Sequence, residues 1–278
     1  MSRLRHRNRH GRGFTLVEIL VTVSIIAILA GLVVGISGSA LKSANSVRET
    51  GAAKTLITAF VNTAVDNDGK YMAGYDRTAQ DFSLPDGTVL SGPPAQRYPY
   101  RLASYFNYEM RGTIVVNDNL RQIAFTDTYS ISCFPAFGMN YIFVGGDISA
   151  AGAMTFPDEC LTRQGMASSI MVFATAAGAG TAPGGSGGTQ ISGYCILTPP
   201  KETTSLWSAA AWTKDADPAQ YGNVDARYSG KAICAFLDGS VRRYGVEELR
   251  DMRLWNRNAL AQNNPNYVVP PTTRPGRP

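Results

Sequence analysis

An uninterrupted apolar stretch near the N-terminus, residues 14–36, constrains this chain most. It is 23 residues long and contains one ionisable side chain, Glu18. As an α-helix it would be about 34 Å long, enough to cross a hydrocarbon core of about 30 Å. A carboxylate at mid-bilayer costs roughly 2.5 kcal/mol or more, so a span that keeps one is expected to use it.

The charges around this stretch predict its orientation. The residues before it include five arginines and no acid, namely Arg3, Arg5, Arg7, Arg9 and Arg12. Positive charge stays on the cytoplasmic side, so we expect a single-pass inner-membrane protein with a cytoplasmic N-terminus and an extracytoplasmic C-terminal domain. A secretory signal cut near residues 37–40 and an uncut signal anchor are the alternatives, but neither accounts for Glu18.

Residues 13–18, GFTLVE, follow the basic leader and resemble the leader junction of type IV prepilins and type II secretion pseudopilins. In that family a prepilin peptidase/methyltransferase cuts after the glycine and N-methylates the next residue. The resemblance implies that Gly13 and Phe14 form the processing site. It also implies that Glu18 serves assembly, by neutralising the new α-amine of its own or a neighbouring subunit. Alternatively, Glu18 only reaches toward the cytoplasmic headgroups.

Charge and histidine content argue against an enzyme and against nucleic-acid binding. The leader holds five of the 26 basic residues, and the remaining 21 equal the 21 acidic residues, so no basic footprint for nucleic acid is left. Both histidines, His6 and His10, also lie in the leader. A mature chain without histidine cannot build a Ser-His-Asp triad or a His-ligated zinc site. We therefore expect neither catalysis nor a cofactor.

Cysteines and acids leave two structural questions open. The four cysteines all follow the apolar stretch: Cys133, Cys160, Cys195 and Cys234. Outside the cytoplasm we expect at least one disulfide among them, with three pairings open and a buried thiol as the alternative for Cys234. Asp215, Asp217, Asp225 and Asp238 are candidate ligands for calcium. These acids form no compact loop of the calcium-binding kind, so we expect solvated side chains and no metal.

Periodicity predicts an α+β, pilin-like fold, in which a long N-terminal helix packs on a C-terminal antiparallel sheet domain. We expect a leader at 1–13, a transmembrane half-helix at 14–36, an amphipathic half-helix at 37–66, a globular domain at 67–261 and a disordered, proline-rich tail at 262–278. Apolar runs predict strands at 137–144, 169–174 and 194–198, and residues 176–188 read as a flexible loop. The best hairpin signal joins 231–237 to 240–244 through Asp238 and Gly239, and 246–260 has helical periodicity.

The hairpin region, residues 233–241, also resembles the C-terminus of a pseudopilin-like subgroup with a histidine, nine residues and then Asp-Gly. Tyr228 occupies the histidine position, which leaves an imidazole role in doubt but keeps the turn. The two resemblances imply a structural subunit of a type II secretion-like pseudopilus or type IV pilus, with other pilin subunits, an assembly ATPase and a platform protein as partners. The alternative is a membrane-anchored extracytoplasmic module that binds a carbohydrate or surface ligand.

Overall fold

The structure is a computed structural model that describes residues 14–117, 122–165, 169–179 and 190–270, with residues 32–39 described as backbone only. Gly13 and the rest of the leader lie outside the described residues. The chain divides into two compact units, residues 1–44 and 45–278. Each unit is described separately below.

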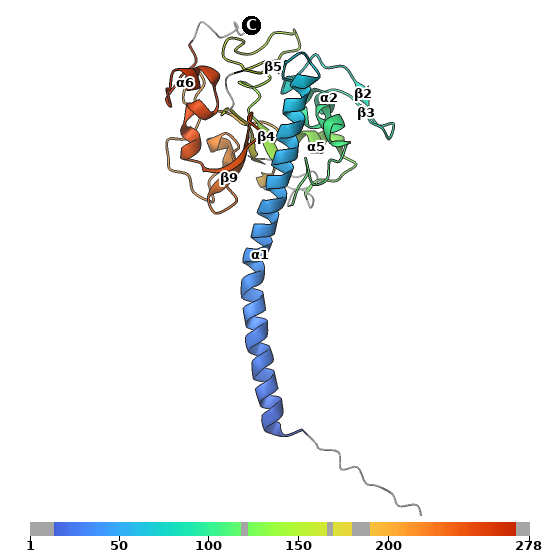
Figure 1. The fold of residues 1–278 in the computed structure, drawn as a ribbon, viewed down its shortest axis with the longest axis vertical. Helices are drawn as coiled ribbons and strands as arrows, with labels where there is room; N and C mark the ends of the chain where they lie inside the picture. Colours follow the sequence, from blue (N-terminus) through green and yellow to red (C-terminus); the bar gives the residue numbers. More distant parts are fainter. Residues whose placement is uncertain (1–13, 118–121, 166–168, 180–189, 271–278) are drawn as a thin grey trace, which may run out of the picture. The chain divides into compact units, whose positions relative to one another are not determined.

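One helix, α1 (Leu16–Val65), contributes residues to both units (Figure 1). No proline occurs between its start and Pro85, so nothing in the sequence interrupts its hydrogen bonding. It ends where Asp68 and Gly69 adopt positive φ angles of 49° and 78°. The Gly69 amide donates to the carbonyl oxygen of Ala64 at 2.7 Å, which satisfies a carbonyl in the last turn.

In the first unit, the apolar side chains of α1 lie on the surface. Leu16 is 81% exposed, and Leu20 and Ile28 are 62% and 65% exposed. Within the described ranges, none of the helices combines the length and the apolar character that crossing a membrane requires. The transmembrane half-helix at 14–36 therefore stays a prediction.

The second unit is built on a four-stranded antiparallel sheet with strand order β10-β9-β6-β4. Its strands are β4 (Phe137–Met139), β6 (Met171–Thr175), β9 (Lys231–Phe236) and β10 (Val241–Gly245). β9 and β10 form a hairpin whose turn contains Asp238 and Gly239. Gly239 has a φ of 75°, and the Asp238 carboxylate accepts from the Ser240 amide at 2.8 Å, so both residues fit the turn.

Short elements surround this sheet. β1 (Tyr75–Asp76) pairs in parallel with β5 (Asp147–Ile148), while β2 (Phe82–Ser83) with β3 (Val89–Leu90) and β7 (Ala177–Ala179) with β8 (Gln190–Ser192) are antiparallel pairs. The short helices are α2 (Pro93–Gln96), α3 (Tyr98–Arg101), η1 (Ala103–Phe106), α5 (Thr128–Cys133), η2 (Pro218–Tyr221), η3 (Glu248–Arg250), η4 (Met252–Leu254) and α6 (Arg257–Ala261).

The sheet separates two apolar cores. On β9, Ile233 and Ala235 join the core that contains the second part of α1, and the Phe60 ring meets Phe173 of β6 edge-on at 5.9 Å. The alternate β9 side chains, including Phe236, join a second core around Trp255. This alternation is what a strand buried on both faces requires. The chain therefore has a mixed helix and sheet fold with an N-terminal helix and antiparallel sheets.

The predicted strand at 137–144 is wrong beyond Met139. The Asn140 side chain is fully buried and donates to the carbonyl oxygens of Met171 at 3.0 Å and Trp255 at 2.9 Å. The chain then turns through Gly145, whose φ is 76° and where a Cβ would lie 2.2 Å from the Met72 carbonyl oxygen. A buried polar side chain and a glycine without space for a Cβ end the strand.

Three other secondary-structure predictions also need correction. Residues 194–198, predicted as a strand, form one isolated bridge, between Ile196 and Met139. The predicted loop at 176–188 contains strand β7, and residues 180–188 lie outside the described residues. Residues 246–260 form η3, η4 and α6 instead of one helix. Polar side chains interrupt the predicted helix: the Asp251 carboxylate accepts a hydrogen bond from the Arg253 amide, and the Asn256 side chain caps the start of α6.

The predicted disordered tail is wrong for residues 262–270. Tyr267 and Val269 are 5% and 1% exposed within the second core. The Tyr267 hydroxyl donates to the buried carboxylate of Glu159 at 2.8 Å. Two apolar anchors and one hydrogen bond thus order a segment whose polar composition suggested disorder; residues 271–278 lie outside the described part.

Candidate functional site

The described part of the processing junction begins at Phe14, and Thr15 and Glu18 form its hydrogen-bonded core. The Thr15 amide and hydroxyl both donate to Glu18 Oε2, at 2.8 and 2.9 Å. The Glu18 amide donates to Thr15 Oγ1 at 3.3 Å. This reciprocal pattern between an N-cap threonine and a glutamate three residues later is a capping box. It holds the carboxylate at the positive end of the helix dipole, beside the chain position where the cut would expose an amine.

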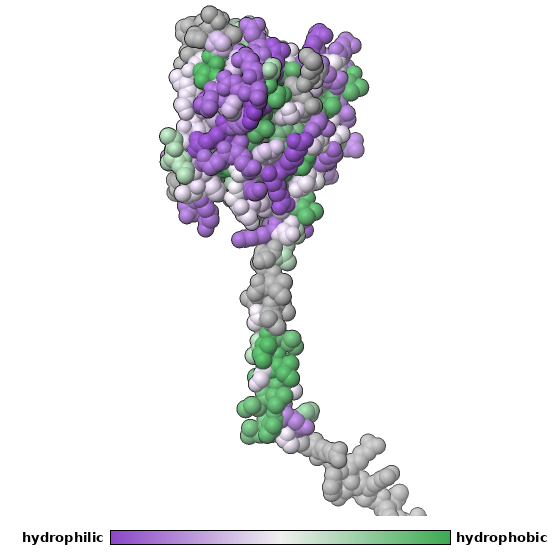
Figure 2. Space-filling view, turned by 60° about the vertical axis from the view of Figure 1, so that its left-hand side comes forward, coloured by the Kyte–Doolittle hydropathy of each residue, from purple (hydrophilic) through white to green (hydrophobic). Residues whose placement is uncertain are grey.

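Around this carboxylate the surface is apolar. Figure 2 shows the described start of α1 as a hydrophobic surface on the face in view. Phe14 is 80% exposed and Val17 is 68% exposed. A contiguous apolar surface of this kind marks a site of contact with a membrane or another protein.

Residues 8–34 match the family model of the prokaryotic N-terminal methylation motif. This match is consistent with a type IV prepilin- or pseudopilin-like protein. The matched region contains Gly13, Phe14 and Glu18, and the motif implies processing by a prepilin peptidase and assembly with other pilins. No curated protein and no solved structure matches the chain.

In the globular unit, a buried carboxylate of α1 contacts Arg227 and Tyr228, which precede the β9–β10 hairpin. Glu49 is completely buried. Its Oε1 accepts from Asn117 Nδ2 at 3.0 Å and from Arg227 Nη1 at 3.4 Å, and the carboxylate also hydrogen bonds with the Tyr228 hydroxyl. Arg227 Nε lies 2.9 Å from Asp225 Oδ2, so one guanidinium serves two acids. Burial raises the pKa of Glu49, and Arg227 opposes that rise.

The sequence analysis missed Glu49, although a signal for it exists. It lies three and seven residues before Ala52 and Leu56, which places it on the buried face of α1. An acid on an apolar face predicts a buried partner. Tyr228, which occupies the position of the histidine in the C-terminal resemblance, hydrogen bonds with Glu49 of α1.

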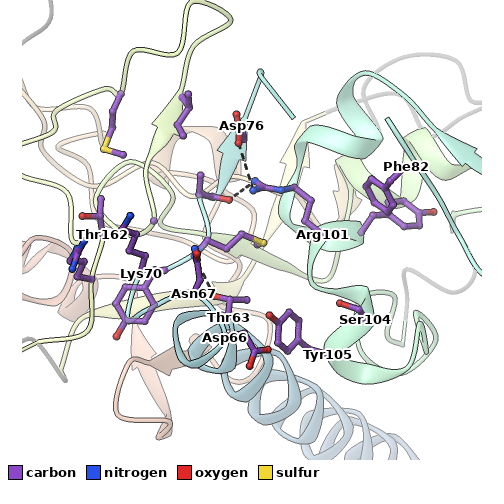
Figure 3. A pocket seen from close by; sticks show the side chains of 18 of the residues that line it. Thr63, Asp66, Asn67, Lys70, Asp76, Phe82, Arg101, Ser104, Tyr105 and Thr162 are labelled. Carbon is purple, nitrogen blue, oxygen red and sulfur yellow. Dashed lines mark hydrogen bonds and ion pairs between the residues drawn. The ribbon is translucent and has the colours of Figure 1, made fainter. Parts of the chain in front are cut away.

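A pocket of about 770 Å³ lies at the end of α1 (Figure 3). Its polar lining comes from α1, η1 and the loops at 67–76 and 162–163: Thr63, Asp66, Asn67, Ser104, Tyr105 and Thr162. On its wall, Arg101 Nη1 donates to the Ala73 carbonyl oxygen at 2.6 Å and the guanidinium lies 3.7 Å from Asp76. The Tyr105 hydroxyl hydrogen bonds with Asp66, and burial together with this contact raises the pKa of Tyr105.

Two cations at the pocket are exposed. Lys70 and Arg163 are backbone neighbours through an antiparallel bridge, and both line the pocket. Neither side chain belongs to an ion pair found within the described residues. The pocket therefore combines tyrosine rings, hydroxyl and amide groups, the carboxylate of Asp66 and the exposed cations Lys70 and Arg163.

The structure places the four cysteines as buried free thiols, so the predicted disulfide is not present in it. Burial raises the pKa of the Cys160 and Cys195 thiols to about 12. Burial also raises the pKa of Cys234, which lies in the middle of β9. Cys133 and Cys195 are adjacent, because the Cys195 amide donates to the Cys133 carbonyl oxygen at 2.9 Å.

Three of the four aspartates predicted as candidate calcium ligands have local roles, and Asp215 is exposed. Asp217 caps η2, Asp225 pairs with Arg227, and Asp238 pairs with Arg242 at 2.9 Å. Across the described ranges, no group of three or more histidine, cysteine, aspartate or glutamate side chains is arranged to hold a metal ion. Local turns and ion pairs account for those three acids.

Proposed function

We propose that this chain is a precursor cut after Gly13 and N-methylated at Phe14, whose apolar helix then assembles into a type II secretion-like pseudopilus or a type IV pilus. The observation that carries the proposal is the methylation motif at residues 8–34. The exposed apolar start of α1 supports it, because none of the described residues of its own unit covers that surface. In this proposal the chain is a structural subunit and a substrate of the processing enzyme.

The capping box explains how Glu18 would act in assembly. Cleavage places a positive α-amine on Phe14, next to the Thr15 that already hydrogen bonds with Glu18 Oε2. A carboxylate held at this position neutralises its own amine or that of an incoming subunit, and an opposite charge nearby offsets the cost of desolvating it. The proposal places residues 14–36 in the inner membrane, with the leader in the cytoplasm and the globular unit outside.

The test is mass spectrometry of the mature N-terminus together with an assembly assay. We expect a chain that starts with N-methyl-Phe14, and filaments that contain it when an assembly ATPase and platform protein are present. Recovery of an intact Met1, or of a start near Lys42, would overturn the processing proposal.

Two substitutions separate the assembly role of Glu18 from its capping role. Glu18→Ala removes the carboxylate, and we expect it to block filament incorporation while the chain still enters the membrane. Thr15→Ala removes the donor hydroxyl but keeps the carboxylate, and we expect it to assemble. Equal loss in both variants would show that helix capping, and not charge neutralisation, is what assembly needs.

The pocket at the end of α1 favours a second candidate function, a membrane-anchored module that binds an acidic carbohydrate. Tyrosine faces pack on sugar rings, and Lys70 and Arg163 would attract carboxylates. The test is calorimetric titration of the full chain in detergent with a galacturonate oligosaccharide. Lys70→Ala and Arg163→Ala are expected to weaken binding at least about fivefold, the loss of roughly one charged hydrogen bond. Arg111→Ala, outside this pocket, is the control, and absence of binding would exclude this candidate.

A further inference from the structure

Cys133 and Cys195 are joined by a backbone hydrogen bond, and Arg97 lies beside them. Cys133 ends α5, and Cys195 follows β8 in a segment that hydrogen bonds with β4. The Cys195 amide donates to the Cys133 carbonyl oxygen at 2.9 Å, and the Cys195 carbonyl oxygen accepts from the Met139 amide at 3.0 Å. Backbone bonds on both sides therefore fix Cys195 against the end of α5.

A guanidinium lies over this pair. Arg97 Nη1 is 2.8 Å from Cys133 Sγ and 3.1 Å from Ser132 Oγ. Burial raises the pKa of Cys195; the Arg97 charge opposes that rise and the neighbouring Cys133 adds to it. The two side chains thus share one local environment.

We infer that Cys133 and Cys195 form the disulfide of this domain, while Cys160 and Cys234 stay as thiols. The backbone hydrogen bond holds Cys133 and Cys195 side by side, and a disulfide needs Cα atoms about 4.4–6.8 Å apart. Cys234 lies with the core on the other face of the sheet from Cys195. Cys160 lies two residues after Asp158, whose carbonyl oxygen accepts from Arg257, and Arg257 is the charged group that acts on the Cys160 thiol.

The chemistry needs an oxidant, which we take to be an external disulfide, such as oxidised glutathione or the active disulfide of an oxidoreductase. The Cys133 thiolate attacks one sulfur of that disulfide, and the first thiol leaves. The Cys195 thiolate then attacks the mixed disulfide at Cys133, and the second thiol leaves. Two protons leave the cysteines and two electrons pass to the oxidant. Both residues are buried, at 9% and 4% exposure, so the bond forms as the domain folds.

The location of this reaction outside the cytoplasm rests on the proposed function, but the pairing does not. The test uses the full chain in detergent, unfolded and refolded in a glutathione redox buffer. Free thiols are then alkylated under denaturing conditions, and the peptides are mapped without reduction. We expect one cross-linked peptide that joins Cys133 to Cys195, and complete alkylation of Cys160 and Cys234. Alkylation of all four cysteines, or a cross-link to Cys160 or Cys234, would overturn the inference.

Thermal unfolding gives a second measurement. The bond would close a loop of about 60 residues, so reduction is expected to lower the Tm by on the order of 10 °C. Cys195→Ala should abolish this dependence on reductant, whereas Cys160→Ala should keep it. A wild-type Tm that does not change with reductant also counts against the bond. The N-terminal peptide from the same digest reports N-methyl-Phe14 independently, so the two proposals fail separately.

Discussion

The two parts of α1 contain similar apolar residues but bury them very differently. Before residue 32, Ile19, Leu20 and Ile28 are 51%, 62% and 65% exposed. After residue 45, Leu56, Ile57 and Phe60 are all completely buried within the globular unit. One continuous helix therefore carries an apolar surface that is exposed among the described residues of its own unit and an apolar face that forms a core.

Under the proposed function, this difference separates assembly from folding along α1. Side chains that are already buried can affect only the stability of the globular unit. Exposed apolar side chains can still be buried against another subunit or lipid, as expected of a precursor before assembly. The two carboxylates follow the same division: Glu18 hydrogen bonds with Thr15 at the exposed start, and Glu49 is enclosed by the domain.

The largest expected effect comes from Phe60. Its ring stacks on Tyr71 at 5.2 Å and meets Phe173 edge-on at 5.9 Å. Phe60→Ala would leave a cavity between α1 and the sheet and is expected to lower the free energy of unfolding by about 3–5 kcal/mol. Urea unfolding of the full chain in detergent, followed by circular dichroism, measures this loss.

Ile25→Ala is the matched control, because Ile25 lies in the exposed part and is 51% exposed. We expect its free energy of unfolding to stay within about 0.5 kcal/mol of the wild type. A similar loss for both variants would show that the exposed part also belongs to the folding unit.

The next effect is the pH dependence set by Glu49. Burial raises the pKa of Glu49 from its usual value of 4.5, so the folded chain holds this proton more tightly than the unfolded chain does. Its contribution is complete below about pH 4.5 and is lost as the pH rises through the higher pKa of the folded state. Glu49→Gln removes this titration. The unfolding free energy of the wild type should therefore fall relative to that of the variant as the pH rises above 4.5.

Acids with lowered pKa values do not confuse this comparison. Asp127 and Asp251 accept hydrogen bonds from Ser130 and Arg253, which lower the pKa of each carboxyl. Both proteins contain these groups, so their titration cancels in the difference between wild type and Glu49→Gln. A difference that is constant between pH 4 and 8 would contradict the burial of an ionisable Glu49.

The sequence predicted what depends on local pattern and missed what depends on distant contacts. Two predictions needed only a few neighbouring residues. These were the glycine, phenylalanine and glutamate at fixed spacing and the Asp-Gly turn between alternating strands. Glu49 meets Asn117 and Arg227, which lie far away in the sequence, and no periodicity identifies those partners. Asn140 ended a predicted strand for the same reason, because its acceptors are the carbonyls of Met171 and Trp255.

Two glycines of α1 give a smaller and opposite effect. A Cβ at Gly51 would have no heavy atom within 4 Å, and the same holds for Gly31. Gly51→Ala is expected to stabilise the globular unit by about 0.5–1 kcal/mol, because glycine loses more backbone entropy in a helix. Gly31→Ala lies in the other unit and should leave the Tm of the globular unit unchanged. Equal shifts in calorimetry would contradict the division of α1.

The smallest effect is confined to the first turn of α1. Thr15→Ala removes the hydroxyl that bonds with Glu18 and should cost the helix start about 1 kcal/mol. Exchange of the amide hydrogens of Glu18 and Ile19, which donate to Thr15, should then speed up about fivefold, while the Tm of the globular unit stays constant. Thr22→Ala is the control, because the Thr22 hydroxyl donates to carbonyl oxygens within the helix and caps nothing. If both variants changed exchange equally, or if exchange in β9 also changed, the helix start would not be the independent element that the exposed part of α1 requires.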